Sequence, residues 1–182
     1  ETLQELFLKI RENMHIRRFK RLEGILVPYV HGGGKIGVMV NLETPAGATD
    51  AVLACGKDCA LQVAALKAPY LKREDVPADV LESEKKIMLA QMDEDPKMAN
   101  KPEQVKAKIV EGKIGKYYSE NCLLDQEFVK DGSFTVQKYV DNCAKEANTT
   151  IKVVDYVCFE RGEGVEKKED NFADEVASMM KK

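Results

Sequence analysis

The sequence predicts an α+β protein with a small antiparallel sheet packed with helices, an inserted antiparallel helical hairpin and a short C-terminal helix. Three observations lead to this prediction. Apolar residues alternate around residues 25–42 and 150–159, as they do in half-buried strands. Between and after these segments, apolar residues recur at helical spacing. No strand–helix–strand repeat requires a parallel sheet.

The N-terminal part is predicted to hold one helix and a β-hairpin. Residues 2–10 form a helix with one apolar face, made of Leu3, Leu6, Phe7 and Ile10. The pattern is strand-like in residues 14–22 and 24–30, and residues 36–42 form a strand rich in β-branched side chains. Glycines at 32–34 separate the last two strands and supply the positive φ angles that a tight reversal needs.

Three helices should follow the β-hairpin. The first covers residues 49–67, with Val52, Leu53, Cys59, Val63 and Leu66 facing inward, and Pro69 ends it. The next two cover residues 73–93 and 102–118. Their apolar stripes are narrow and flanked by charge, which favours a projecting helical hairpin over a buried bundle.

The C-terminal part is predicted to alternate between irregular and regular structure. Residues 123–129 form an irregular apolar segment. A helix over 135–147 precedes a strand over 150–159, and residues 162–164 form a turn. Residues 170–181 form a final short helix, which begins at Asp170 or Asn171.

Composition narrows the class of protein. The chain has 182 residues, of which 44% are hydrophobic and 32% are charged, as in ordinary globular domains. A net charge of -3 argues against binding of nucleic acid or membranes through bulk charge, and the longest apolar runs are too short to cross a bilayer. Five scattered cysteines indicate reduced core thiols and a cytoplasmic compartment. Because the chain begins at Glu1 and not Met, we expect that upstream residues have been removed.

The motifs do not predict a catalytic, cofactor or metal site. Gly32-Gly33-Gly34-Lys35 resembles a phosphate-binding loop, but the spacing is wrong because the first glycine is missing, and Ile36 replaces the magnesium-binding hydroxyl. The chain has no Gly-x-Ser-x-Gly motif. Cys55 and Cys59 share a helix face, but no second pair with matching spacing completes a metal site. A binding protein is the remaining interpretation.

Three segments are candidate contact surfaces, each with a simpler alternative. The basic stretch Arg17–Arg21 could contact RNA, although the negative net charge and the lack of an aromatic platform favour a solvated strand face. His31 beside three glycines is either a protein contact on an exposed loop or an inert loop residue. The C-terminal stripe docks on its own body or on a partner, and consists of Phe172, Val176, Met179 and Met180.

Several strings, taken together and in order, carry a family resemblance. Residues 10–18 read Ile-x-Glu-Asn-Met-x-Ile-Arg-Arg, residues 22–24 Leu-Glu-Gly, and residues 29–38 Tyr-Val-His-Gly-Gly-Gly-Lys-Ile-Gly-Val. Residues 123–129 read Leu-Leu-Asp-Gln-x-Phe-Val, residues 159–167 Phe-Glu-x-Gly-Glu-Gly-Val-Glu-Lys, and residues 171–177 Asn-Phe-Ala-x-Glu-Val-Ala. The chain thereby resembles the bacterial translation elongation factor Ts family, whose members are the exchange factors for the GTPase EF-Tu.

The resemblance implies a division of the chain into parts. Residues 1–11 resemble the end of an upstream helix, and residues 12–72 with 122–159 resemble the second core subdomain, which grips domain 3 of EF-Tu. Residues 73–121 resemble the helical-hairpin insertion, which makes homodimers in some members. Residues 160–182 resemble the C-terminal module, which lies against the nucleotide-binding domain of EF-Tu.

The resemblance also implies contact residues. His31, the loop Gly32, Gly33 and Gly34, and Val129 match family contacts to domain 3 of EF-Tu, and Met179 matches a contact of the C-terminal module. It implies no cofactor, metal or catalytic residue in this chain, because the magnesium and the phosphate loop belong to EF-Tu. Neither a membrane nor direct nucleic-acid binding is expected.

The chain departs from the family pattern in ways that bear on activity. The N-terminal ubiquitin-associated-like domain and the first core subdomain are not among these residues. Thr49-Asp50-Ala51-Val52 lacks the phenylalanine of the family's Thr-Asp-Phe-Val wedge, Arg11 replaces a glycine and His15 replaces an asparagine. We therefore expect EF-Tu binding that is weaker than that of a whole factor, with poor release of GDP. No covalent chemistry is needed, because a factor that prefers nucleotide-free EF-Tu must weaken GDP binding by thermodynamic linkage.

Overall fold

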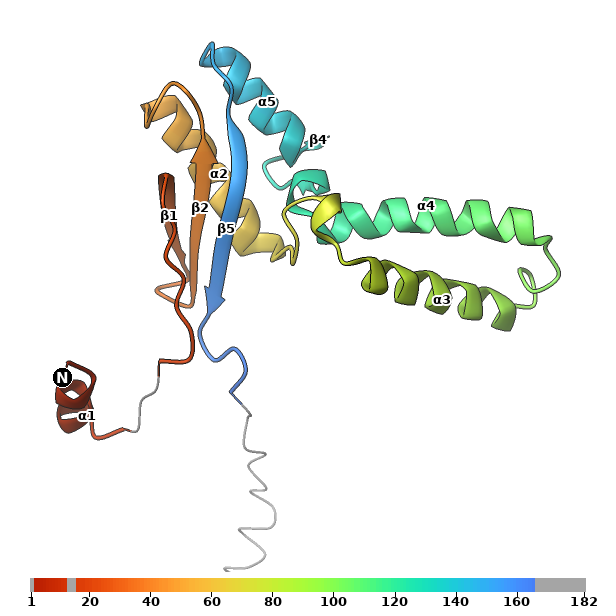
Figure 1. Cartoon of the computed structure of the whole chain (residues 1–182), viewed down its shortest axis with the longest axis horizontal. Coiled ribbons are helices and arrows are strands. Elements are labelled where there is room, and N and C mark those ends of the chain that lie inside the picture. Colours follow the sequence, from red (N-terminus) through yellow and green to blue (C-terminus); the bar gives the residue numbers. More distant parts are fainter. Residues whose placement is uncertain (1, 13–15, 166–182) are drawn as a thin grey trace, which may run out of the picture.

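A three-stranded antiparallel sheet forms the centre of the molecule. The computed structural model describes residues 2–12 and 16–165, and Figure 1 shows how they are arranged. The strands are β1 (Ile25–His31), β2 (Ile36–Glu43) and β5 (Lys152–Glu160), in the order β1-β2-β5. The predicted β1–β2 hairpin and the predicted α+β class are confirmed. Because β5 comes from the far end of the described chain, the sheet is complete only when distant segments have come together.

One face of the sheet packs against α2 (Asp50–Leu66), and α5 (Val136–Glu146) packs against α2 and adds to the same core. Strand β2 shows the expected alternation, because Val38, Val40 and Leu42 are buried whereas the residues between them are only half-buried. Val40 stands opposite Val27 of β1 and Tyr156 of β5. Full burial of one such valine is worth about 1.5–3 kcal/mol, so this face carries much of the fold's stability.

Helix α2 lies unusually close to the sheet at Gly56. The helix begins after Thr49, whose hydroxyl accepts a hydrogen bond from the Val52 amide at 3.4 Å. A Cβ added at Gly56 would lie 2.6 Å from Val27 Cγ2 and 2.9 Å from Leu42 Cδ1. Glycine is therefore required here by the closeness of helix and sheet.

The predicted helical hairpin is confirmed and projects from the side of the body (Figure 1). It consists of α3 (Ala78–Glu94) and α4 (Glu103–Asn121), which pack around a small cluster of their own formed by Met92, Val110 and Ile114. At its base, the Tyr70 amide donates to the Asn121 carbonyl at 3.2 Å, and the Leu123 amide donates to the Tyr70 carbonyl at 2.9 Å. The two ends of the hairpin therefore meet at one point.

Two predicted elements differ from the structure near the hairpin. The helix predicted from residue 73 begins at Ala78, after a short 3-10 turn over Arg73–Asp75, because Pro77 keeps the residue before it extended. Residues 123–129 are not wholly irregular. They contain a 3-10 turn over Leu123–Asp125 and the short strand β3 (Glu127–Phe128), which pairs with β4 (Asp131–Thr135).

Other corrections concern single segments. The strand predicted over 14–22 is wrong, because residues 16–23 have no regular secondary structure. Leu66, predicted to face inward, is 49% exposed at the last turn of α2. Helix α1 (Thr2–Ile10) forms as predicted, and all of its residues are exposed. The predicted final helix over 170–181 lies outside the described residues.

Candidate protein-docking site

The turn between β1 and β2, residues 31–35, is the first predicted contact and is called the glycine turn below. It is closed by the Lys35 amide, which donates to the His31 carbonyl at 3.1 Å. Gly32, Gly33 and Gly34 have φ angles of 60°, 64° and 88°, a conformation that side chains oppose. A Cβ at the second or third glycine would meet nothing within 4 Å. The backbone conformation therefore requires glycine here, and the surface above the turn is open.

His31 is exposed at the end of β1, as the sequence predicts for a loop tip. Its Nδ1 atom lies 3.0 Å from the Tyr29 hydroxyl, and the two ring centroids are 6.0 Å apart. This contact orients the imidazole on the surface of the edge strand. The histidine is thus presented to solvent in a fixed direction, which suits a contact residue.

Val129 lies in a second segment, residues 126–130, in which buried and exposed residues alternate and which is called the Val129 loop below. The Val129 side chain is 41% exposed, whereas the side chain of Phe128 before it is 3% exposed and stacks on Tyr139 with 4.1 Å between ring centroids. One residue of this pair therefore anchors the loop and the next faces outward.

A buried amide of α2 holds the Val129 loop. Gln62 Nε2 donates to the Gln126 Oε1 atom at 3.1 Å and to the Glu127 carbonyl at 3.0 Å. Gln62 Oε1 accepts from the Val129 amide at 2.8 Å. Gln126 in turn donates to the Glu120 carbonyl in the last turn of α4 at 3.0 Å.

A second contact from α2 holds the end of the Val129 loop. Asp58 forms an ion pair with Lys130 and accepts a hydrogen bond from the Tyr139 hydroxyl at 2.7 Å. Burial, followed by this hydrogen bond, raises the pKa of Tyr139, so the phenol remains a donor. The loop is therefore fixed to α2 at both ends.

The predicted site residues fall into two separate places. The glycine turn lies at the lower end of the sheet in Figure 1, whereas β4, which follows the Val129 loop, lies beyond α2 near the base of the hairpin. Met179 lies outside the described residues. Our sequence analysis missed Gln62 and Asp58. A polar residue inside the apolar run from Cys59 to Ala64 was the available signal for Gln62, because buried amides in such runs need internal partners.

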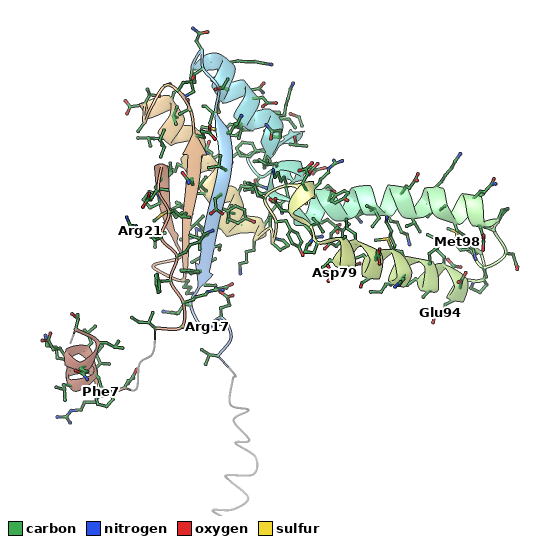
Figure 2. All side chains as sticks on the ribbon, viewed as in Figure 1. Phe7, Arg17, Arg21, Asp79, Glu94 and Met98 are labelled. Carbon is green, nitrogen blue, oxygen red and sulfur yellow. The ribbon has the colours of Figure 1, made fainter. Side chains whose placement is uncertain are left out.

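The basic stretch over 17–21 is engaged in contacts with its own chain. Arg18 forms an ion pair with Glu163, and its guanidinium lies 4.6 Å from the centroid of the Phe159 ring. Lys20 Nζ lies 2.6 Å from Asp155, and Arg21 lies 2.8 Å from Glu23. Figure 2 shows Arg17 near the lower end of β5 and Arg21 beside β1. These contacts engage the basic side chains within the chain, and RNA binding by this stretch stays an untested alternative.

The cysteines, possible metal ligands and helices of the described residues bear on whether the chain has catalytic, metal or membrane-spanning sites. All five cysteines are free thiols, and burial raises the pKa of Cys122 and of Cys143 to about 11 in each case, which keeps both protonated at neutral pH. Within residues 2–12 and 16–165, no three His, Cys, Asp or Glu side chains come together as metal ligands. None of the helices in these ranges has the length and apolar character needed to cross a membrane.

The described residues therefore form a small α+β body that carries two candidate contact loops, the glycine turn and the Val129 loop. Comparison with known proteins gives its family: the model of the family described as "Elongation factor TS" matches residues 1–163, and the chain belongs to this family. The chain is 43% identical to elongation factor Ts of Clostridium kluyveri and 44% identical to that of Clostridium botulinum, over 99% of its own length. It spans 58% of the length of each of these relatives.

Proposed function

We propose that the chain binds the GTPase EF-Tu and promotes release of GDP in the cytoplasm. The family match over residues 1–163 carries the proposal. The mechanism is linkage: a chain that binds nucleotide-free EF-Tu more tightly than its GDP complex weakens GDP binding by the same factor. The chain needs no nucleophile or general base for this purpose and acts without covalent catalysis.

In this proposal the core contacts domain 3 of EF-Tu through two loops. Residues 12–72 and 122–159 form the gripping subdomain, with His31 and the glycine turn at one place and Val129 at the other. Residues 160–182 act as the module that meets the nucleotide-binding domain, with Met179 as a contact. The exposure of His31 and Val129 and the hydrogen bonds that hold both loops favour this assignment.

We expect the chain to bind EF-Tu but to accelerate GDP release poorly. The 182 residues do not contain Thr-Asp-Phe-Val, the family motif associated with the magnesium site of EF-Tu. A chain with the contact loops but without this motif should bind EF-Tu more weakly than a whole factor does. It should also accelerate the release of GDP from EF-Tu only slightly.

Titration calorimetry with EF-Tu tests the proposal. At concentrations on the order of 10 μM, even a modest interface gives measurable heat. We expect binding to nucleotide-free EF-Tu and weaker binding to the GDP complex. Absence of heat with both forms would contradict the proposal. Release of a fluorescent GDP analogue then measures exchange, and rates equal to those of a whole factor would show that the wedge is dispensable.

A His31→Ala variant tests the assigned contact. We expect an affinity for EF-Tu about fivefold to tenfold weaker, as for a typical interface side chain of importance, with no loss of folding. Lys101→Ala, at the exposed far end of the hairpin, serves as the matched control and should bind as the unaltered chain does. Equal affinities for both variants would make His31 a bystander.

We also propose that the hairpin over 73–121 pairs with a second copy of the chain. A groove of about 510 Å³ runs between α3 and α4, with Leu89, Ala107 and Val110 among its lining residues. Ile87 and Val105 are further exposed apolar side chains on the hairpin. Sedimentation equilibrium tests this proposal, since Leu89→Lys should convert a dimer into a monomer. A chain that is monomeric at every concentration would contradict it.

A further inference from the structure

We infer that Gln62 is a positioning residue for partner binding, because it fixes the Val129 loop in the conformation that presents Val129. The inference rests on the proposed function and extends it to a residue that touches no partner. Gln62 is 0% exposed, so any effect on binding must pass through the atoms that it contacts.

The hydrogen bonds of Gln62 all point to the Val129 loop. Both of its donor bonds and its acceptor bond go to residues 126, 127 and 129. A buried amide costs free energy unless its groups are paired, and a fully paired one adds rigidity and selects one arrangement. Because the partners are a side chain, a carbonyl and an amide of one short segment, this arrangement is a specific backbone conformation of the loop.

The amide network also connects the loop to the hairpin. Gln126 is 1% exposed and joins Gln62 to the Glu120 carbonyl, in the last turn of α4. The loop is thereby held between α2 on one side and the end of the hairpin on the other. The ion pair between Lys130 and Asp58 fixes the residue that follows Val129.

The outward direction of Val129 follows from these contacts. Its amide is bonded inward to Gln62, and its neighbour Phe128 fills the core against Tyr139. Rotation of the peptide to bury Val129 would break the first contact and expose the second. A side chain that is already held in its bound direction binds without the cost of ordering it, so the network should contribute to affinity.

A purely structural role for Gln62 makes a different prediction. In that case its removal would lower stability, and affinity would change only because less of the chain is folded. In the positioning role, its removal weakens binding at full folding, and the effect depends on the presence of the Val129 side chain. A double-mutant cycle separates the two roles.

The experiment compares Gln62→Met, Val129→Ala and the double variant of the full chain by calorimetry with nucleotide-free EF-Tu. Methionine has a similar length and no amide, so it leaves the Gln126 side-chain carbonyl, the Glu127 carbonyl and the Val129 amide unpaired. Val52→Ala is the control, because it also alters a buried α2 residue but lies ten residues, or about 15 Å, along the helix from Gln62.

We expect Gln62→Met to bind about fivefold more weakly at a temperature where melting curves show it fully folded. In the Val129→Ala background, Gln62→Met should weaken binding by less than about twofold, because the Val129 side chain that Gln62 positions is already absent. Val52→Ala should lose stability and keep its affinity. Unchanged affinity of Gln62→Met, or an equal factor in both backgrounds, would overturn the inference.

Two further results keep the inference testable if Gln62→Met does not fold. In the unaltered free chain, the Val129 amide should exchange slowly with solvent deuterium and should not become much slower in the complex. Fast exchange that slows only on binding would show that the loop is ordered by the partner and would overturn the inference. If the unaltered chain does not bind EF-Tu, the proposed function is wrong. If it binds and the Gln62→Met variant binds with the same affinity, only this inference is wrong.

Discussion

Gly56→Ala is the substitution whose effect the structure determines most directly. In an isolated helix, alanine is more favourable than glycine by about 1 kcal/mol. At position 56, however, the new methyl would lie 2.6 Å from Val27 Cγ2 and 3.1 Å from Val27 Cβ. A rotation of the valine side chain cannot move its Cβ, and Leu42 is buried beside it, so α2 must move away from the sheet.

The magnitude follows from the balance of these two effects. Overpacking of a core costs about 1–3 kcal/mol, and the helix preference of alanine offsets about 1 kcal/mol of this, so the net loss in the free energy of unfolding should be about 0–2 kcal/mol. The fixed position of the Val27 Cβ favours the upper end of this range. Gly112→Ala in α4 is the matched control, because its methyl would meet nothing within 4 Å and should stabilise the helix by about 1 kcal/mol.

Urea unfolding followed by circular dichroism measures both Gly56→Ala and Gly112→Ala. A Gly56→Ala variant that is stabilised as much as Gly112→Ala would refute the close approach of α2 to the sheet. Since Asp58 and Gln62 lie farther along the same helix, a displaced α2 should also loosen the Val129 loop and weaken EF-Tu binding.

Three further predictions concern stability. Burial raises the pKa of the Cys122 thiol from 9.0 to about 11. The contribution of the protonated thiol to the free energy of unfolding is therefore complete below pH 9, and it falls by about 2 kcal/mol as pH rises to 11. Cys122→Ala should flatten this part of a urea-stability profile, and an unchanged slope would contradict the assignment. Arg73→Ala removes the 2.8 Å bond to Asp125 and should cost about 1 kcal/mol while speeding amide exchange in the hairpin alone. Thr49→Ala should cost about 1 kcal/mol in thermal melting and Thr49→Asp almost nothing; equal losses would exclude a capping role.

Elements whose signals are local could be predicted from the sequence. The β1–β2 hairpin follows from alternating apolar residues on both sides of three glycines, and α2 from helical spacing between Thr49 and Pro69. Residues 16–23 carry scattered apolar residues, but a strand needs a neighbouring edge to bond with, and basic side chains of this segment pair instead with Asp155 in β5 and Glu163 in the turn after it. Strands β3 and β4 are too short to produce a recognisable pattern.

The candidate site was predictable only in part for a related reason. The exposure of His31 follows from its glycine neighbours, whereas its contact with EF-Tu stays a prediction. The support of Val129 depends on Gln62, which is 67 positions away in the sequence. No local pattern reveals such a pairing, although a lone amide in an apolar helical run indicates that a distant partner exists.

The closed base of the helical hairpin allows its length to vary independently of the rest of the fold. Because Tyr70 and Asn121 are joined by a backbone hydrogen bond, the chain leaves the body after α2 and returns to it at a single point. With 19 residues in α4, the arm reaches about 28 Å outward. Whole turns could be added to both helices, or removed from both, and the sheet would still receive β5 in the same register. Natural variation and protein engineering can therefore alter the reach of this arm while the docking loops keep their shape.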